Sequence, residues 1–159
     1  SRMSTIVANR IESLQSGQTT FTATPYVVSF FAYEGSSNTG SGTLIYTLTQ
    51  HNIGSAYDAS TGKFTAPIKG VYTFSCNVLR SGGDGNVAFK VNDGHAFLSN
   101  NSTNDRIAQY VRATQYDHGS LTANFQLNAN DTVSVVTTAT LTVYGNYSHF
   151  SGHLIGAIE

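Results

Sequence analysis

Residues 52–75 read NIGSAYDASTGKFTAPIKGVYTFS, a stretch that combines turn-forming residues with the beginning of a strand. Gly62 and Gly70 permit backbone conformations that other residues resist. Pro67 suits the start of a connection better than the centre of a sheet. Over residues 71–78 the chain alternates strictly, so that one face of a strand carries Tyr72, Phe74, Cys76 and Val78. The stretch therefore predicts turns that lead into a half-buried strand.

Strand patterns continue through the rest of the chain. Apolar and polar residues alternate at every step of residues 121–127 (LTANFQL), and residues 132–138 are β-branched nearly throughout. Asn92-Asp93-Gly94 separates two apolar runs and predicts a hairpin. In residues 147–158 the small Gly152 lets rings or backbones approach closely. Several short strands with regular turns predict an all-β sandwich or barrel.

The N-terminal residues follow a different pattern. Residues 3–16 carry Met3, Val7, Arg10 and Leu14 at heptad spacing. Two heptads form only a marginal helix in isolation, so the segment is either the end of a coiled-coil stalk or a frayed terminus. We expect residues 1–20 to be a stalk remnant or linker and residues 21–159 to form one globular domain.

Composition restricts the function classes. The net charge is −1 and charged residues make up 11% of the chain, so long-range attraction to nucleic acid is not expected. The chain has a single cysteine, which excludes an intrachain disulfide. No apolar run is long enough to span a membrane, so membrane insertion is not expected. The sequence shows no signal peptide, as expected for a mature fragment.

Four ordered segments resemble the complement C1q globular-head family. Residues 52–75 are similar to its pattern N-x-G, Y-D-x-x-T-G-x-F-x-A-P, G-V-Y-x-F. Residues 147–154 are similar to its Y-S-x-F-S-G-x-L ending, and residues 28–32 to its first strand. Residues 125–133 resemble its L-x-L-x-x-G-D-x-V turn, with Asn130 in place of the usual glycine. The likeness extends over about residues 25–158.

The resemblance implies a fold, an assembly and a location. The fold is a ten-stranded jelly-roll sandwich of two antiparallel sheets, as in tumour-necrosis-factor ligands. The family packs as homotrimers around a threefold axis, often above a stalk, and its members are secreted. Extracellular localisation is therefore an expectation from the resemblance alone.

Catalytic motifs are absent from the sequence. It has no G-x-S-x-G elbow, no H-E-x-x-H and no phosphate-binding loop. Cys76 is the one candidate nucleophile, but strand alternation places it on the core face, where a buried and inert thiol is expected. We expect a binding protein without catalytic residues.

Metal-binding candidates are weak. His149 and His153 share one face of the last strand but lie about 13 Å apart at about 3.3 Å per residue, so they cannot hold one ion within a chain. The resemblance implies that this strand lies near the trimer axis, where three copies of one histidine would either converge on an ion or contact a neighbouring subunit. Residues 137–146 correspond to the loop that holds calcium in some relatives, and they include no Asp or Glu. No cofactor is expected there, and calcium at another position stays open.

Two segments are candidate ligand-binding surfaces. Residues 99–119 concentrate charge and aromatic side chains, which suit carboxylate, sulfate, phosphate and sugar groups. The alternative is that residues 107–113 form an edge strand with solvated charges. The second surface is the tyrosine pair on either side of Gly145-Asn146. The candidate ligand-binding residues are Arg106, Tyr110, Arg112, Tyr116, Asp117, His118, Tyr144 and Tyr147.

The expected function is a secreted, trimeric pattern-recognition protein of innate immunity that binds glycans or microbial surface ligands in the manner of a lectin. This step is an analogy with C1q-domain proteins of invertebrates. The alternatives are a signalling ligand for a cell-surface receptor and a component of the extracellular matrix. Glycosylation sequons begin at Asn100, Asn101, Asn130 and Asn146, and the pair at 100–101, in a polar loop, is the expected site of use.

Overall fold

The computed structural model describes residues 26–34, 38–83, 85–95, 108–111 and 116–159. These residues form twelve strands and one short 3-10 helix, η1. In chain order the elements are β1 (Ser29–Tyr33), β2 (Asn38–Thr43), β3 (Leu48–Ile53), β4 (Tyr57–Asp58), β5 (Lys63–Thr65), β6 (Gly70–Gly82), β7 (Gly85–Val91), β8 (Gly94–His95), β9 (Ala108–Val111), β10 (Asp117–Leu127), β11 (Thr132–Val143), η1 (Gly145–Tyr147) and β12 (His149–Ala157).

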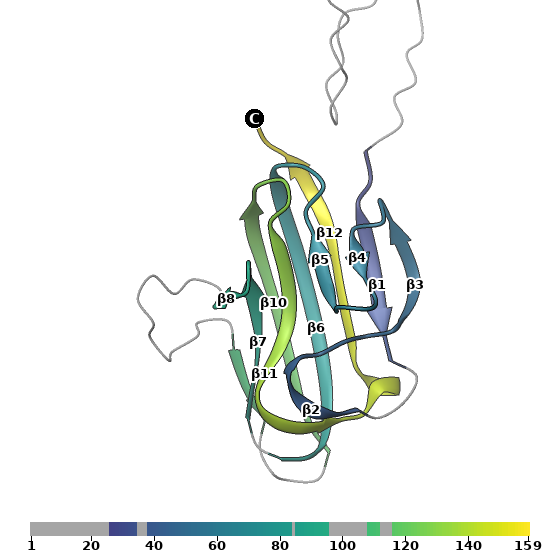
Figure 1. Ribbon diagram of the computed structural model, residues 1–159, viewed down its shortest axis with the longest axis vertical. Coiled ribbons are helices and arrows are strands. Elements are labelled where there is room, and N and C mark those ends of the chain that lie inside the picture. Colours follow the sequence, from purple (N-terminus) through teal and green to yellow (C-terminus); the bar gives the residue numbers. More distant parts are fainter. Residues whose placement is uncertain (1–25, 35–37, 84, 96–107, 112–115) are drawn as a thin grey trace, which may run out of the picture.

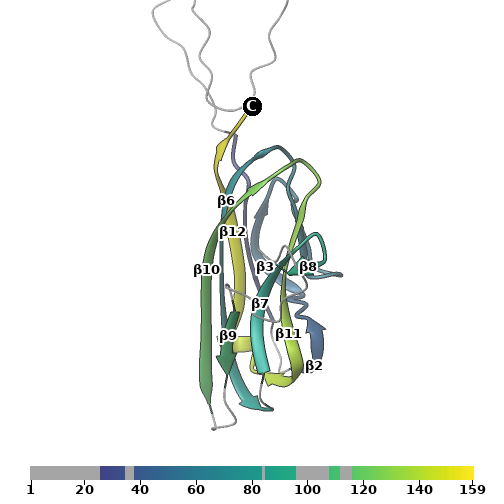
Figure 2. The same ribbon diagram turned by 90° about the vertical axis from the view of Figure 1, so that its left-hand side faces the viewer.

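The strands pack as the two layers of an antiparallel sandwich (Figures 1 and 2). One layer has the order β3-β1-β12-β6-β10, and the other is built around β11, which pairs with β2, β5 and β7. The end of β11 also pairs with β6, at Val143 and Arg80, which joins the two layers. The predicted all-β jelly roll is confirmed. The assigned strands number twelve instead of ten, because two-residue segments such as β4 and β8 are counted.

Aromatic side chains fill the space between the layers. The central strand β6 alternates between buried and half-buried residues, and Tyr72, Phe74, Cys76 and Val78 are each at most 1% exposed. The ring of Phe74 lies 5.0 Å from that of Phe64 and 6.0 Å from that of Phe150, measured between centroids. Ring pairs at these separations stabilise a core beyond their buried area. The face of β6 predicted to be buried is therefore confirmed.

The hairpin predicted at residues 92–94 joins β7 to β8. Val91 pairs with Gly94, so Asn92 and Asp93 are the two central residues of the turn. Both have positive φ, 51° and 60°, which is the signature of a type I′ turn. Asn and Asp tolerate this conformation better than other non-glycine residues.

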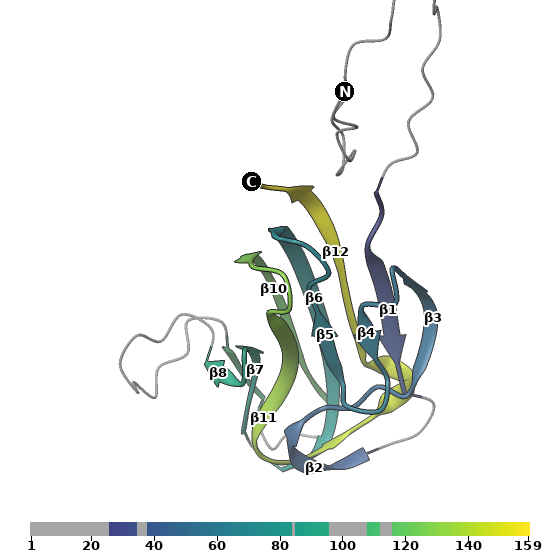
Figure 3. The same cartoon turned by 45° about the horizontal axis from the view of Figure 1, so that its top comes forward.

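The two ends of the sandwich differ. The C-terminus and the start of β1 lie at one end, and η1 lies at the other (Figures 1 and 3). No helix among the described residues is long and apolar enough to cross a membrane. The predicted stalk at residues 3–16 and the domain boundary after residue 20 lie outside the described residues.

Candidate ligand-binding site

Three tyrosines meet at the η1 end of the sandwich. Tyr144 follows β11, Tyr147 is the last residue of η1, and Tyr116 immediately precedes β10. With Leu79 and His118 they line a concavity of about 420 Å³, which we call the tyrosine pocket. Tyr116 and Tyr147 are 57% and 64% exposed, so the pocket opens to solvent.

Buried hydrogen bonds fix the backbone that carries Tyr144 and Tyr147. The amide of Tyr144 donates to the carbonyl of Leu79 at 2.8 Å. The hydroxyl of Ser148 donates to the carbonyl of Tyr144 at 2.7 Å and accepts from the amide of Leu79 at 3.0 Å. Ser148 is 3% exposed, so these bonds form away from water. These hydrogen bonds tie the loop to β6, so the loop forms a rigid wall of the pocket.

The rings of Tyr116 and Tyr144 stack on each other. Their centroids are 5.8 Å apart and their planes differ by 20°. A hydrogen bond with the Tyr144 side chain raises the pKa of Tyr116, and the nearby Tyr144 charge acts in the same direction. Tyr116 has φ 65°, a left-handed conformation that is strained in a non-glycine residue. Local strain that positions an exposed ring is typical of functional sites.

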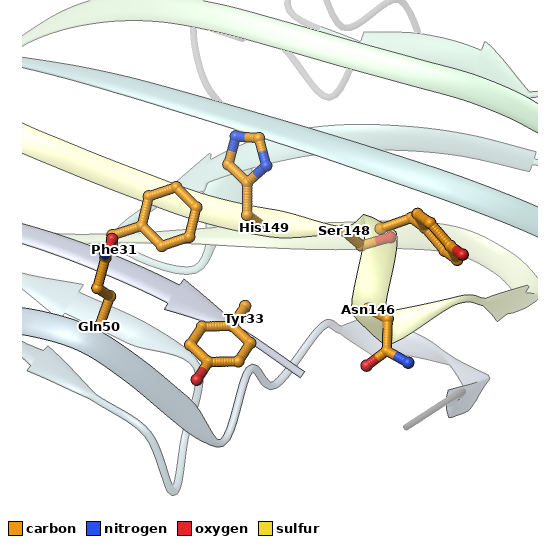
Figure 4. A pocket seen from close by; sticks show the side chains of 7 residues that line it. Phe31, Tyr33, Gln50, Asn146, Ser148 and His149 are labelled. Atoms are coloured by element: carbon orange, nitrogen blue, oxygen red, sulfur yellow. The ribbon is translucent and has the colours of Figure 1, made fainter. Parts of the chain in front are cut away.

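A second concavity of about 480 Å³ shares Tyr147 with the tyrosine pocket and is called here the β1/β12 concavity. Figure 4 shows Phe31 and Tyr33 from β1, His149 from β12 and Asn146 from η1 around it. The ring of His149 stacks on Phe31 with centroids 5.0 Å apart. Burial lowers the pKa of His149 from its usual value, so the neutral imidazole is favoured. The complete lining is Phe31, Tyr33, Gln50, Asn146, Tyr147, Ser148 and His149.

The residues that line these two concavities carry no carboxylate, ammonium or guanidinium group. Two charged residues lie close in sequence to the tyrosine pocket. The carboxylate of Asp117 accepts the amide of His118 at 3.0 Å. Arg80 is fully buried and its guanidinium donates to the carbonyl of Gly83. The described part of the site therefore offers aromatic faces, hydroxyls and imidazole to a ligand.

The structure brings together residues that the sequence assigned to two separate surfaces. Tyr116 and His118 from residues 99–119 share one pocket with Tyr144 and Tyr147. Asp117 lies between the first two and is half-buried. Tyr110 belongs to β9, which pairs with β7 as the edge-strand alternative anticipated. Arg106 and Arg112 lie outside the described residues, so their assignment stays a prediction.

The sequence did not indicate the apolar wall of the site. Leu79 lies on β6, far from the tyrosines along the chain, and only the pairing of β6 with β10 and β11 brings it to the pocket. Phe31, Tyr33 and Gln50 reach the β1/β12 concavity through the pairing of β1 with β12 and β3. The one sequence signal for this part of the site was the motif of residues 147–154, which includes Ser148.

The described residues include no group of three or more His, Cys, Asp or Glu side chains placed to hold a metal ion. His149 and His153 do share the outer face of β12, opposite Tyr33 and Ser29 of β1. Ligand binding measured in calcium and in chelator tests calcium dependence.

Comparison with known proteins agrees with this architecture. The globular domain of zebrafish complement 1qA superposes with a TM-score of 0.59 at 17% identity, covering 82% of this chain and 99% of that one. Murine APRIL gives a TM-score of 0.57 at 10% identity, covering 82% of this chain and all of that one (100%). Eiger TNF from S. frugiperda gives a TM-score of 0.56 at 15% identity, covering 84% of this chain and 94% of that one. The sequence profile of the C1q domain matches residues 27–155, and the chain therefore belongs to the C1q domain family.

Proposed function

We propose that this domain is an extracellular, trimeric recognition module that binds the sugar rings of glycans in the tyrosine pocket. The observation that carries the proposal is the pocket itself, in which stacked and exposed tyrosines meet at a fixed backbone. C1q- and TNF-like domains are typically binding and signalling domains, commonly trimeric, and C1q domain proteins are typically extracellular. These family properties support the assembly and the location.

Sugar recognition suits the chemistry of the pocket. A tyrosine ring offers a flat apolar face to sugar C–H groups and a hydroxyl at its edge. His118 adds a ring nitrogen that donates or accepts a hydrogen bond. The volume of about 420 Å³ falls within the usual range for small-ligand sites. Because the described lining carries no formal charge, we expect neutral sugars to bind without a bridging cation.

A trimer raises the avidity of such a shallow site. Each additional site on one particle converts later binding into an intramolecular event, which multiplies a weak affinity by orders of magnitude. The outer face of the β3-β1-β12 layer supports a subunit contact, since it exposes four large apolar side chains: Tyr33, Leu48, Ile53 and Ile155. We assign the β1/β12 concavity, which includes Tyr33, to this contact and the tyrosine pocket to the ligand.

The test is binding of the purified trimer to an array of glycans and microbial polysaccharides, in calcium and in chelator. We expect selective binding to neutral glycans that chelator leaves unchanged. Binding that disappears in chelator would contradict the cation-free site.

A protein receptor is the second candidate, because the family includes signalling ligands. It predicts that the array stays silent in both buffers while the domain binds cells and loses that binding after protease treatment of the cells. That result would overturn the glycan proposal.

A further inference from the structure

The turn between β10 and β11 carries a glycosylation sequon, Asn130-Asp131-Thr132. We propose that Asn130 is the attachment site of an N-linked glycan. This inference is independent of the ligand in the tyrosine pocket. Of the other sequons, those at Asn100 and Asn101 lie outside the described residues, and the one at Asn146 lies on η1.

The backbone around Asn130 is held on both sides while its side chain faces solvent. The amide of Asn130 donates to the carbonyl of Ala66 at 2.8 Å, and the amide of Ala66 donates to the carbonyl of Asp131 at 2.8 Å. Asn130 is exposed and has φ 72°, a conformation that Asn adopts more readily than most residues. A glycan at this position would therefore not disturb the fold.

Neighbouring side chains complete this support without using the Asn130 carboxamide. The two carboxylate oxygens of Asp131 accept from the Asn92 side chain at 2.8 Å and from the amide of Asn128 at 2.7 Å. The carboxamide oxygen of Asn92 accepts from the amide of Thr132 at 2.8 Å. The turn keeps its shape through Asn92 and Asp131, so the Asn130 side chain is available for modification.

The Asn146 sequon differs from the Asn130 sequon in the burial of its hydroxyl-bearing residue, Ser148. The hydroxyl of Ser148 is buried and engaged with both Tyr144 and Leu79, so the folded chain withdraws it from a transferase. Thr132, the equivalent residue of the Asn130 sequon, stays half-exposed. In the folded domain the Asn130 sequon is therefore the more accessible of the two.

The reaction is a group transfer with a lipid-pyrophosphate-linked oligosaccharide as the donor. The carboxamide nitrogen of Asn130 forms a bond to the anomeric carbon of the sugar. The bond from that carbon to the pyrophosphate oxygen breaks, and the lipid pyrophosphate leaves with the electron pair. The amide gives up one proton, and no oxidant or reductant is needed.

The position of the turn has a functional consequence. It lies at the end of the sandwich that carries the C-terminus, and η1 lies at the other end (Figures 1 and 3). The tyrosine pocket is lined by Tyr147 of η1 and by Tyr144 next to it. A glycan on Asn130 therefore leaves the pocket open. A glycan on Asn146 would stand beside Tyr147 and cover it, since Asn146 lines the adjoining concavity.

The experiment is peptide mapping of the full chain secreted from a eukaryotic host, before and after an amidase that converts glycosylated Asn to Asp. We expect the peptide with residue 130 to be recovered as Asp only after the amidase. Thr132→Val removes the sequon hydroxyl but keeps Asn130 and the strand shape, and it should abolish the modification. Thr132→Ser keeps the sequon and should retain it.

The same sample tests whether the glycan on Asn130 affects ligand binding in the tyrosine pocket. Amidase treatment should leave glycan-array binding unchanged. An unmodified Asn130 peptide in the secreted protein, whatever the occupancy of the other sequons, overturns the proposal. Persistence of the modified peptide in Thr132→Val also overturns it.

Discussion

A Cβ atom at Gly152 would lie 2.5 Å from Cδ1 of Phe74 and 2.9 Å from Cε1 of Phe30. Both rings are buried in the centre of the core and neither has room to move. We expect Gly152→Ala to lower the free energy of unfolding by about 1–3 kcal/mol, as overpacking does. Urea denaturation of the purified domain measures this loss.

Gly156 is the matched control on the same strand. A Cβ atom there meets nothing within 4 Å. Gly156→Ala should therefore change the free energy of unfolding by less than about 0.5 kcal/mol. Equal losses in the two variants would show that β12 is sensitive to any added methyl group and not to the rings behind Gly152.

Cys76 gives a pH-dependent prediction. Burial raises the pKa of its thiol from 9.0 to about 12, so the folded state holds the proton that the unfolded state loses. The contribution to stability is complete below pH 9 and is lost as the pH rises towards 12. Between pH 9 and 10 we expect stability to fall by roughly 1 kcal/mol.

Cys76→Ala removes this titration, so its unfolding free energy should fall less steeply than that of the unmodified protein between pH 8 and 10. Parallel curves for the two proteins would contradict the assignment. The range stops at pH 10 because burial also raises the pKa values of Tyr46 and Tyr57.

Among the elements, the β7–β8 turn and the β10–β11 turn support each other. Asn92 bonds to Asp131 and Thr132 through its side chain, across two hairpins that are distant in sequence. Asn92→Gly keeps the positive φ that the turn requires but removes both bonds, and it should destabilise the domain by about 1–2 kcal/mol.

Asp93→Gly is the comparison within the same turn. It also keeps the turn shape and loses only an exposed ion pair with Lys63, 2.8 Å long. Exposed pairs contribute little, so we expect a change within about 0.5 kcal/mol. Thermal unfolding of both variants distinguishes the two contributions, and a larger effect of Asp93→Gly would contradict the role of Asn92.

How far the sequence predicted these elements depended on whether the signal was local. Residues 121–127 alternate along the chain, and β10 buries Leu121, Phe125 and Leu127 as that pattern requires. In β12 the register shifts between Leu154 and Gly156, which places Gly156 opposite the half-buried Val71, whereas continued alternation from Phe150 and Leu154 predicts that Gly156 faces the core. Bulges arise from pairing between strands, and pairing is not local information.

The site was predictable only in part for the same reason. Aromatic and charged residues marked Tyr116, His118, Tyr144 and Tyr147 as candidates. That they share one pocket follows from the pairing of β6 with both β10 and β11 around Leu79. Sequence patterns give the faces of strands, whereas long-range pairing decides which faces meet.

For the whole molecule, the account makes a prediction about assembly. Ile155 is 54% exposed on the outer face of β12, where we place the subunit contact. Ile155→Glu buries an unpaired carboxylate in that contact and should reduce the mass in light scattering from a trimer to a monomer. Thr65→Glu adds the same charge at an exposed position of β5, in the other layer, and should remain trimeric. A trimeric Ile155→Glu protein would place the contact elsewhere.

The most direct test of the central claim is the affinity of pocket variants for a glycan that the unmodified trimer binds. Tyr116→Ala combined with Tyr144→Ala should weaken single-site binding at least tenfold, about 1.4 kcal/mol, at unchanged trimer mass, because neither ring lines the β1/β12 concavity. Tyr26→Ala, at an exposed tyrosine near the opposite end, should bind as the unmodified protein does. Full binding by the double variant would contradict the tyrosine pocket as the ligand site.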